Sequence, residues 1–194
     1  MPRKECLSLL GGATSSKSGR VINIVKHWTD AELKSELANL TIICDTREQQ
    51  NAHITKYFDD NRIPYKTRKI DTGDYSAMLG DKTLEFDCVI EKKNSLDEIC
   101  GNLTTDRSRF EREFLRAKAD KIKVFLIIEN ASWGDVFLGN YRSKFPPKSL
   151  LGSLLSWQVR FNVTIIFCKP HDTGKLIWGI LYYYAREVLL FGHG

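Results

Sequence analysis

The order of apolar and polar positions along the chain predicts alternating strands and helices. Continuous apolar runs at 40–45, 123–130 and 163–169 are typical of strands that a sheet buries on both faces. Other segments repeat their apolar residues at helical spacing and predict helices over 29–38, 46–61, a short stretch from residue 95, 106–119, 146–162 and 172–191. The alternation indicates an α/β fold.

The middle of the chain has the pattern of further strands. Residues 65–71 follow Pro64, which prevents a helix from continuing, and are expected to form a strand. Segments 74–79 and 84–93 predict a hairpin whose turn contains Gly80. One face of 84–93 is apolar and carries Leu84, Phe86, Cys88 and Ile90. The other face carries Asp87, Val89, Glu91 and Lys93. We therefore predict a mixed central β-sheet flanked by helices on both faces.

Composition sets the size and the class of the protein. The 194 residues, of which 42% are hydrophobic, suit one domain over 21–194 after a flexible tail at 1–20 that is rich in Gly, Ser and Lys. No run of about 20 apolar residues exists, so we expect no membrane span. A net charge of +5 is compatible with nucleic acid as a partner but does not require it.

The five cysteines are scattered singly and have no spacing typical of a metal site. A structural zinc site is therefore not expected. Their odd number and scatter favour reduced thiols in a reducing intracellular compartment, the cytoplasm or the nucleus.

Polar side chains stand where the predicted strands end. Asp45 closes the first strand, Asp74 opens the hairpin, and Glu91 and Lys93 close it. Such side chains converge at one edge of a sheet, where sites of α/β folds usually lie. Two carboxylates about 4 Å apart repel by about 4 kcal/mol at an effective dielectric of 20. A divalent cation offsets that repulsion, and oxygen ligands suit Mg²⁺ or Mn²⁺.

These residues stand in motifs that resemble a known nuclease family. Asp45-Thr46-Arg47-Glu48, Gly73-Asp74-Tyr75 and the segment from Glu91-Lys92-Lys93 to Asp97 are similar to the nuclease domain of XPF-type endonucleases, within the PD-(D/E)XK superfamily. The family signature is GD, a variable gap, then ERK-x-x-x-D. The gap here is seventeen positions. Asp106-Arg107-Ser108-Arg109-Phe110 is similar to a following D-x-R-F segment.

The resemblance covers roughly residues 40 to 170 and implies a restriction-endonuclease-like core. It implies that three acids ligate the metal, namely Asp45, Asp74 and Glu91. Lys93 would be the catalytic lysine, and three residues would support the site, namely Arg47, Glu48 and Asp97. Mg²⁺ would be the cofactor, with Mn²⁺ as a substitute. Lys92 stands where the family usually has Arg, which keeps the charge but loses the bidentate fork.

DNA is the partner that the resemblance implies, either branched, as in a junction or flap, or plain duplex, during recombination, repair or replication. The side chains expected to contact it are Lys92, Arg107, Arg109 and Arg68. Cellular relatives usually carry a helix-hairpin-helix pair and act as dimers. No such module is recognisable before Gly194, so we expect a stand-alone form, of the kind that a virus or mobile element would encode, acting with a homodimeric or heterodimeric partner.

Other readings of the same residues stay open. The module could have kept the nuclease fold and bind DNA or a partner without cleaving, or it could be a restriction or end-processing nuclease. Glu129, at the end of a buried strand, is a candidate further acid. Trp178 and the tyrosines 182–184 of the closing helix are expected in the core, with a dimer surface as the alternative.

Overall fold

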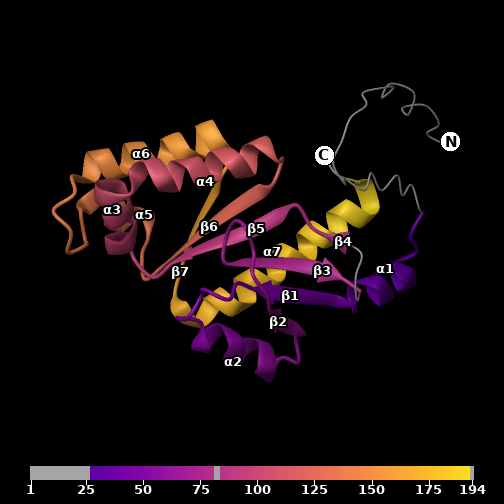
Figure 1. The fold of residues 1–194 in the computed structure, drawn as a ribbon. Coiled ribbons are helices and arrows are strands. Elements are labelled where there is room, and N and C mark those ends of the chain that lie inside the picture. Colours follow the sequence, from indigo (N-terminus) through magenta and orange to yellow (C-terminus); the bar gives the residue numbers. More distant parts are fainter. Residues whose placement is uncertain (1–26, 81–83, 193–194) are drawn as a thin grey trace, which may run out of the picture.

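The computed structural model describes residues 27–80 and 84–192 and has a mixed β-sheet at its centre (Figure 1). Its seven strands are β1 Leu40–Cys44, β2 Tyr65–Thr67, β3 Tyr75–Leu79, β4 Leu84–Glu85, β5 Cys88–Lys93, β6 Lys123–Glu129 and β7 Thr164–Cys168. They lie in the order β2-β1-β3-β5-β6-β7, and β4 pairs with β3. Among these strands only β3 runs against the others, because β1, β4 and β5 are each antiparallel to it. The carboxyl ends of β1, β5, β6 and β7 therefore meet at one edge.

Helices cover both faces of this sheet, which confirms the predicted fold class. One face is covered by α1 Asp30–Leu37, α2 Ala52–Asp60 and α7 Pro170–Phe191. We call it the α2–α7 face. The other is covered by α3 Leu96–Thr105, α4 Arg107–Ala119, α5 Trp133–Leu138 and α6 Pro147–Phe161. We call it the α3–α4 face. On each face, a separate buried hydrophobic cluster fills the space between the sheet and its helices.

The period of two along β5 decides which face each side chain reaches. Cys88 and Ile90 belong to the cluster on the α2–α7 face, and Val89 belongs to the cluster on the α3–α4 face. Because successive side chains alternate, Glu91 and Lys93 lie on the α3–α4 face and Lys92 lies on the other. The predicted alternation of this strand is therefore confirmed.

The predicted helix over 46–61 starts six residues too early. Residues 46–51 form turns and bends, and α2 begins at Ala52. The Asp45 carboxylate accepts a hydrogen bond from Arg47 N at 2.8 Å, and the Glu48 carboxylate accepts one from Gln50 N at 2.8 Å. These local bonds give the backbone an alternative to the helix.

Other boundaries also differ from the prediction. The single strand expected over 84–93 is split into β4 and β5 by Phe86 and Asp87. The strand expected over 65–71 is only three residues long, and the short α5 was not predicted. The tail predicted at 1–20 lies outside the described residues. Within the described part of the chain, no helix is long and apolar enough to cross a membrane.

Candidate active site

Gly73 lets the chain approach β5 closely enough to place Asp74 beside it. Its φ is +82°, and a Cβ atom at this position would lie 2.9 Å from Val89 Cβ. Only glycine combines that conformation with that approach at little cost. Asp74 N then donates to Ile90 O at 2.8 Å, and Lys92 N donates to Asp74 Oδ2 at 2.7 Å. The Gly-Asp pair of the motif thus docks the Asp74 carboxyl against the end of β5.

Asp74 and Glu91 form a closely coupled pair of acids. Burial, and next the charge of Glu91, raise the pKa of Asp74 to about 8. Burial also raises the pKa of Glu91, although Lys93 opposes this shift. The pair is therefore hard to ionise fully without a further positive charge nearby.

Lys93 supplies one positive charge to the site. Its Nζ lies 2.8 Å from Glu91 Oε1 and 3.4 Å from Glu98 Oε1, and 5.4 Å from the centre of the Phe110 ring. Burial alone would lower the pKa of Lys93, but the neighbouring carboxylates raise it above its usual range. Lys93 is therefore an ammonium that its ion pairs fix in position, and it can stabilise negative charge on a phosphate.

The backbone of Asp45 lies next to that of Asp74, but both oxygens of the Asp45 carboxylate already accept hydrogen bonds. Its Oδ1 accepts from Arg47 Nε at 2.7 Å, and its Oδ2 accepts from Ile70 N at 2.6 Å and Arg47 Nη2 at 3.2 Å. Arg47 Nη2 also donates to Ile70 O at 2.8 Å. Burial would raise the pKa of Asp45, but the hydrogen bonds from Arg47 and Ile70 N hold it below its usual range. Through these contacts Asp45 fastens the end of β1 to the loop before Asp74, and its predicted place among the metal ligands stays a prediction.

Replacing Asp45 with asparagine should destabilise the fold by about 2–3 kcal/mol, because it leaves Arg47 and the backbone around Ile70 without their charged acceptor. Urea unfolding at neutral pH measures this change. Asp60→Asn is the matched control, since its carboxylate is exposed and pairs only with Lys56 at 2.8 Å. That control should change stability by less than about 0.5 kcal/mol. An equal effect of both substitutions would contradict the supporting role of Asp45.

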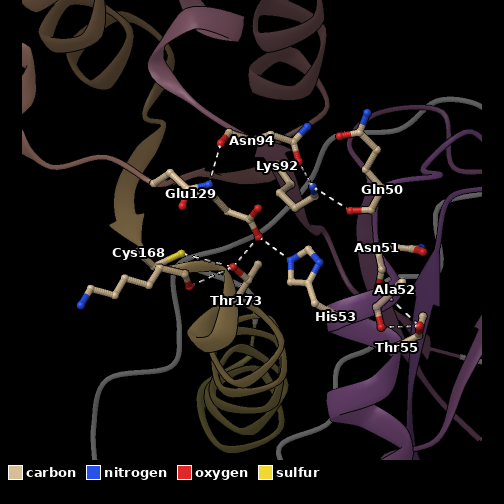
Figure 2. A network of polar contacts seen from close by, with 12 residues as sticks. Gln50, Asn51, Ala52, His53, Thr55, Lys92, Asn94, Glu129, Cys168 and Thr173 are labelled. Carbon is tan, nitrogen blue, oxygen red and sulfur yellow. Dashed lines mark hydrogen bonds and ion pairs between the residues drawn. The ribbon is translucent and has the colours of Figure 1, made fainter. Parts of the chain in front are cut away.

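Lys92 lies inside the protein, which is at odds with its predicted contact with DNA; Figure 2 shows its contacts with Gln50 and Asn94. Its side chain is 0% exposed. Its Nζ donates to Asn94 Oδ1 at 2.7 Å and to Gln50 O at 3.2 Å, and lies 3.8 Å from Glu48 Oε1. A phosphate cannot reach a buried ammonium. Lys92 instead joins the loop after β1 to the end of β5.

Two of the predicted supporting residues have clear structural contacts. Glu48 is mostly buried between Gln50 N and the Lys92 ammonium. Asp97 accepts from Ser143 N at 2.7 Å and Arg142 Nε at 3.2 Å, so it fastens the loop before α6 to the start of α3. Neither carboxylate contacts the Asp74–Glu91 pair directly in these interactions.

The predicted phosphate-contacting arginines differ in their surroundings. Arg107 and Arg109 are exposed at the start of α4, on the same face of the sheet as Lys93. Arg107 Nε pairs with Glu111 Oε1 at 2.9 Å. Arg68 is half-buried beside the end of β2. Contacts of these three side chains with DNA stay a prediction.

The donor set suits a hard divalent cation. Within residues 27–80 and 84–192, no three His, Cys, Asp or Glu side chains form a ready-made ligand group. However, Asp74 Oδ1 and Glu91 Oε2 accept no hydrogen bond from any described residue. One free oxygen on each of two partly buried carboxyls fits Mg²⁺, which usually keeps several waters and takes one or two carboxylates.

Comparison with known proteins agrees with this geometry. The model of the ERCC4 domain matches residues 44–178. The chain belongs to the ERCC4 domain family. No curated protein matches the sequence significantly.

The fold of this ERCC4 domain is also found in solved structures. XPF from Aeropyrum pernix is 18% identical, with a TM-score of 0.55 over 73% of this chain and 65% of that one. The same protein in a complex with DNA is 17% identical, with a TM-score of 0.56 over 75% of this chain and 65% of that one. The ERCC4 domain described here therefore has the XPF-type nuclease fold and spans just under two thirds of those chains.

Sequence reasoning missed two acids of the ERCC4 domain. Glu98 accepts from Asn94 N at 2.8 Å while its other oxygen lies 3.4 Å from Lys93 Nζ. Glu113, on α4, is close enough for its charge to raise the pKa values of Glu91 and Arg47. Both lie on helices one turn after a motif residue, so helical spacing from Asn94 and Phe110 was the available signal.

Glu129 is not part of the acid pair of the ERCC4 domain. It is 2% exposed on the α2–α7 face, where Oε1 accepts from Thr173 Oγ1 at 2.6 Å and lies 2.7 Å from His53 Nε2 (Figure 2). It therefore joins α2 and α7 to the end of β6. Its candidate role as a further acid at the site is not supported by this position.

Proposed function

We propose that this ERCC4 domain is a metal-dependent DNA endonuclease that hydrolyses phosphodiester bonds, acting on branched, junction or flap DNA in recombination, repair or replication. The observation that carries the proposal is the triad of Asp74, Glu91 and Lys93 at one edge of the sheet. The loss of hydration, and next the charge of Glu91, raise the pKa of Asp74 to about 8, and a bound cation would offset both effects. A module without catalysis has no need for that arrangement.

Each residue of the triad has a defined part in this reaction. Asp74 and Glu91 would hold Mg²⁺, or Mn²⁺ in its place, through carboxylate oxygens. The bound ion would supply an activated water and polarise the phosphodiester. Lys93 would place its ammonium against the negative charge that develops on the phosphate. Gly73 and Lys92 N keep Asp74 in position for this work.

DNA binding by this chain is supported by the family and by a relative whose structure was solved as a complex with DNA. Exposed Arg107 and Arg109 lie on the face of the sheet that carries the triad, where they could contact the backbone. The selection of branched DNA, and a homodimeric or heterodimeric state, are predictions that the cleavage and mass measurements below test.

The proposal is tested with end-labelled fork, flap, four-way junction and linear duplex DNA, each with Mg²⁺, with Mn²⁺ and with EDTA. We expect cuts near branch points that need the metal and disappear in Glu91→Gln. Circular dichroism checks that the variant folds, and light scattering gives the mass of the active species. Tight DNA binding without cleavage under any condition would favour the silent binding module. Equal cleavage of linear duplex would favour a restriction or end-processing nuclease.

The salt dependence of DNA binding should distinguish the role of Lys92 from that of the surface arginines. Replacing Arg109 with glutamine should lower the slope of log Kd against log salt concentration for duplex DNA by about 0.9, the value for one lost phosphate contact. Replacing Lys92 with methionine should leave that slope unchanged, because its ammonium is buried. Filter binding in EDTA over a range of salt concentrations gives both slopes. A reduced slope in Lys92→Met would mean that this side chain reaches the DNA.

A further inference from the structure

A cleft lies on the α2–α7 face, away from the face that carries the triad. It has a volume of about 440 Å³ and is lined by residues of α1, of the turn between α2 and β2, and of α7. Such a volume is in the range of clefts that take small ligands. The lining is mixed, with aromatic rings on one side and two cations at the rim.

Two rings of α7 form the aromatic wall. Trp178 and Tyr182 are one helical turn apart, and their ring centres are 5.4 Å apart at an angle of 44°. Both are half-buried, so their faces are partly open to the cleft. The sequence predicted that these residues lie in the core, with a dimer surface as the alternative. The structure places them in neither a fully buried core nor an exposed surface.

Close contacts between α2 and α7, and a hydrogen bond at the end of α2, support the cleft. Tyr57 of α2 packs against Gly174 of α7 so closely that a Cβ atom there would lie 2.7 Å from Tyr57 Cβ. Asn61 Nδ2 donates to Tyr57 O at 2.8 Å and closes the last turn of α2. The next residue, Arg62, has a φ of 55° and lies exposed at the rim.

The charge of the cleft is entirely positive. Its lining contains Lys34 and Arg62 and no aspartate or glutamate. Neither cation is in an ion pair with a described residue. Two acids end α2 nearby: Asp60 is already paired with Lys56 at 2.8 Å, and Asp59 is hydrogen-bonded to Tyr65. A ligand that fits must therefore offer an anion to the rim and a flat apolar face to the rings.

We infer that this cleft binds a single-stranded DNA segment, with a base stacked on Trp178 and Tyr182 and the backbone phosphates beside Lys34 and Arg62. Unpaired bases present the π-faces that aromatic side chains recognise, whereas bases within a duplex are stacked on one another. The inference rests on the proposed function, because it would give a nuclease of branched DNA a place to hold an unpaired arm.

A second groove on α7 provides a matched control. It is larger, about 820 Å³, and runs between α7 and the β6–β7 part of the sheet. Tyr183 and Lys175 line it, but so do Asp172 and Glu187, so its charge does not favour an anion. Removing the Lys175 cation alters the same helix without touching the cleft, whereas the Tyr183 ring lies 5.5 Å from that of Tyr182 and cannot serve as a control.

The test measures the anisotropy of a labelled oligothymidylate, and of a duplex of the same length, with the full chain in EDTA so that no cleavage occurs. Trp178→Leu, which removes the ring but keeps an apolar side chain, should weaken binding of the oligothymidylate about 5- to 150-fold. Trp178→Phe should retain binding. Lys34→Gln should lower the salt slope by about 0.7. Lys175→Gln, the control, should keep the wild-type salt slope and affinity.

Each outcome decides between the two proposals. Normal binding of oligothymidylate by Trp178→Leu overturns the inference, whether or not the wild type cleaves DNA. An equal change of the salt slope in the Lys175 control also overturns it. Binding of deoxyadenylate as tight as that of the oligonucleotide would assign the cleft to free nucleotides instead. Loss in the Trp178 variant alone, in a protein that cleaves nothing with Mg²⁺, would support the inference and overturn the nuclease proposal.

Discussion

Replacing Asp74 with asparagine should stabilise the metal-free protein and abolish its cleavage of DNA. The folded-state pKa of Asp74 is about 8, well above the value of about 3.9 in an unfolded chain. Ionising this group therefore opposes folding, and the cost grows as pH rises from about 4 to about 8. The neutral amide removes that cost, so the gain should be close to zero at pH 4 and should grow by about 1.4 kcal/mol for each pH unit between the two pKa values.

Urea unfolding of both proteins at pH 4 and at pH 8, without divalent metal, measures the gain. Added Mg²⁺ should then stabilise the wild type but not the variant, since binding to the native state alone raises its stability. Asp60→Asn, which removes an exposed acid, should show neither effect. If Asp74→Asn were less stable than wild type at pH 8, the hydrogen bond from Lys92 N would matter more than the repulsion from Glu91.

Replacing Lys93 with methionine should reduce the rate of DNA cleavage by about 10²- to 10³-fold, the usual loss when one preorganised group that stabilises transition-state charge is removed. The substitution should also cost about 3 kcal/mol of stability at neutral pH, because Glu91 is left buried without its partner 2.8 Å away. The two effects have different origins, and saturating Mg²⁺ should restore part of the stability but little of the rate.

Single-turnover cleavage of a branched substrate, under conditions where circular dichroism shows a folded variant, measures the loss of rate. Lys118→Met is a suitable control, because that lysine is exposed on α4 and donates only to the carbonyl of Arg160. It should cleave at the wild-type rate. Full activity of Lys93→Met would remove this lysine from the chemistry and leave the acid pair to act alone.

Strand periodicity was enough to predict which side chains share the active face. Val89, Glu91 and Lys93 alternate with Cys88, Ile90 and Lys92, and the structure keeps this alternation. The edge of the sheet at which the site lies also followed from the sequence, because buried parallel strands end there in polar residues. Local rules of this kind work because they depend on neighbours within the same strand.

Contacts between distant segments could not be predicted in the same way. Asp45 is bound by Ile70 N, 25 positions away, and Lys92 donates to Gln50 O, 42 positions away. No periodic pattern predicts such partners, so both residues were assigned to chemistry from their motif alone. The helix expected over 46–61 failed for a related reason, since carboxylates at its start bound the backbone locally.

Because β5 carries two adjacent lysines, its register against β6 decides which of them reaches the active face. The register therefore affects activity as well as stability. A slip of one residue against β6 would exchange the side chains of Lys92 and Lys93 between the faces of the sheet. The slipped strand would still present an ammonium on the active face, but the Glu91 carboxylate would move to the opposite face. The burial of that carboxylate, and the fit of Val89 and Ile90 into their different hydrophobic clusters, distinguish the two arrangements. Refolded samples should therefore be judged by the rate of cleavage per molecule, because a soluble and compact product can still hold the wrong register.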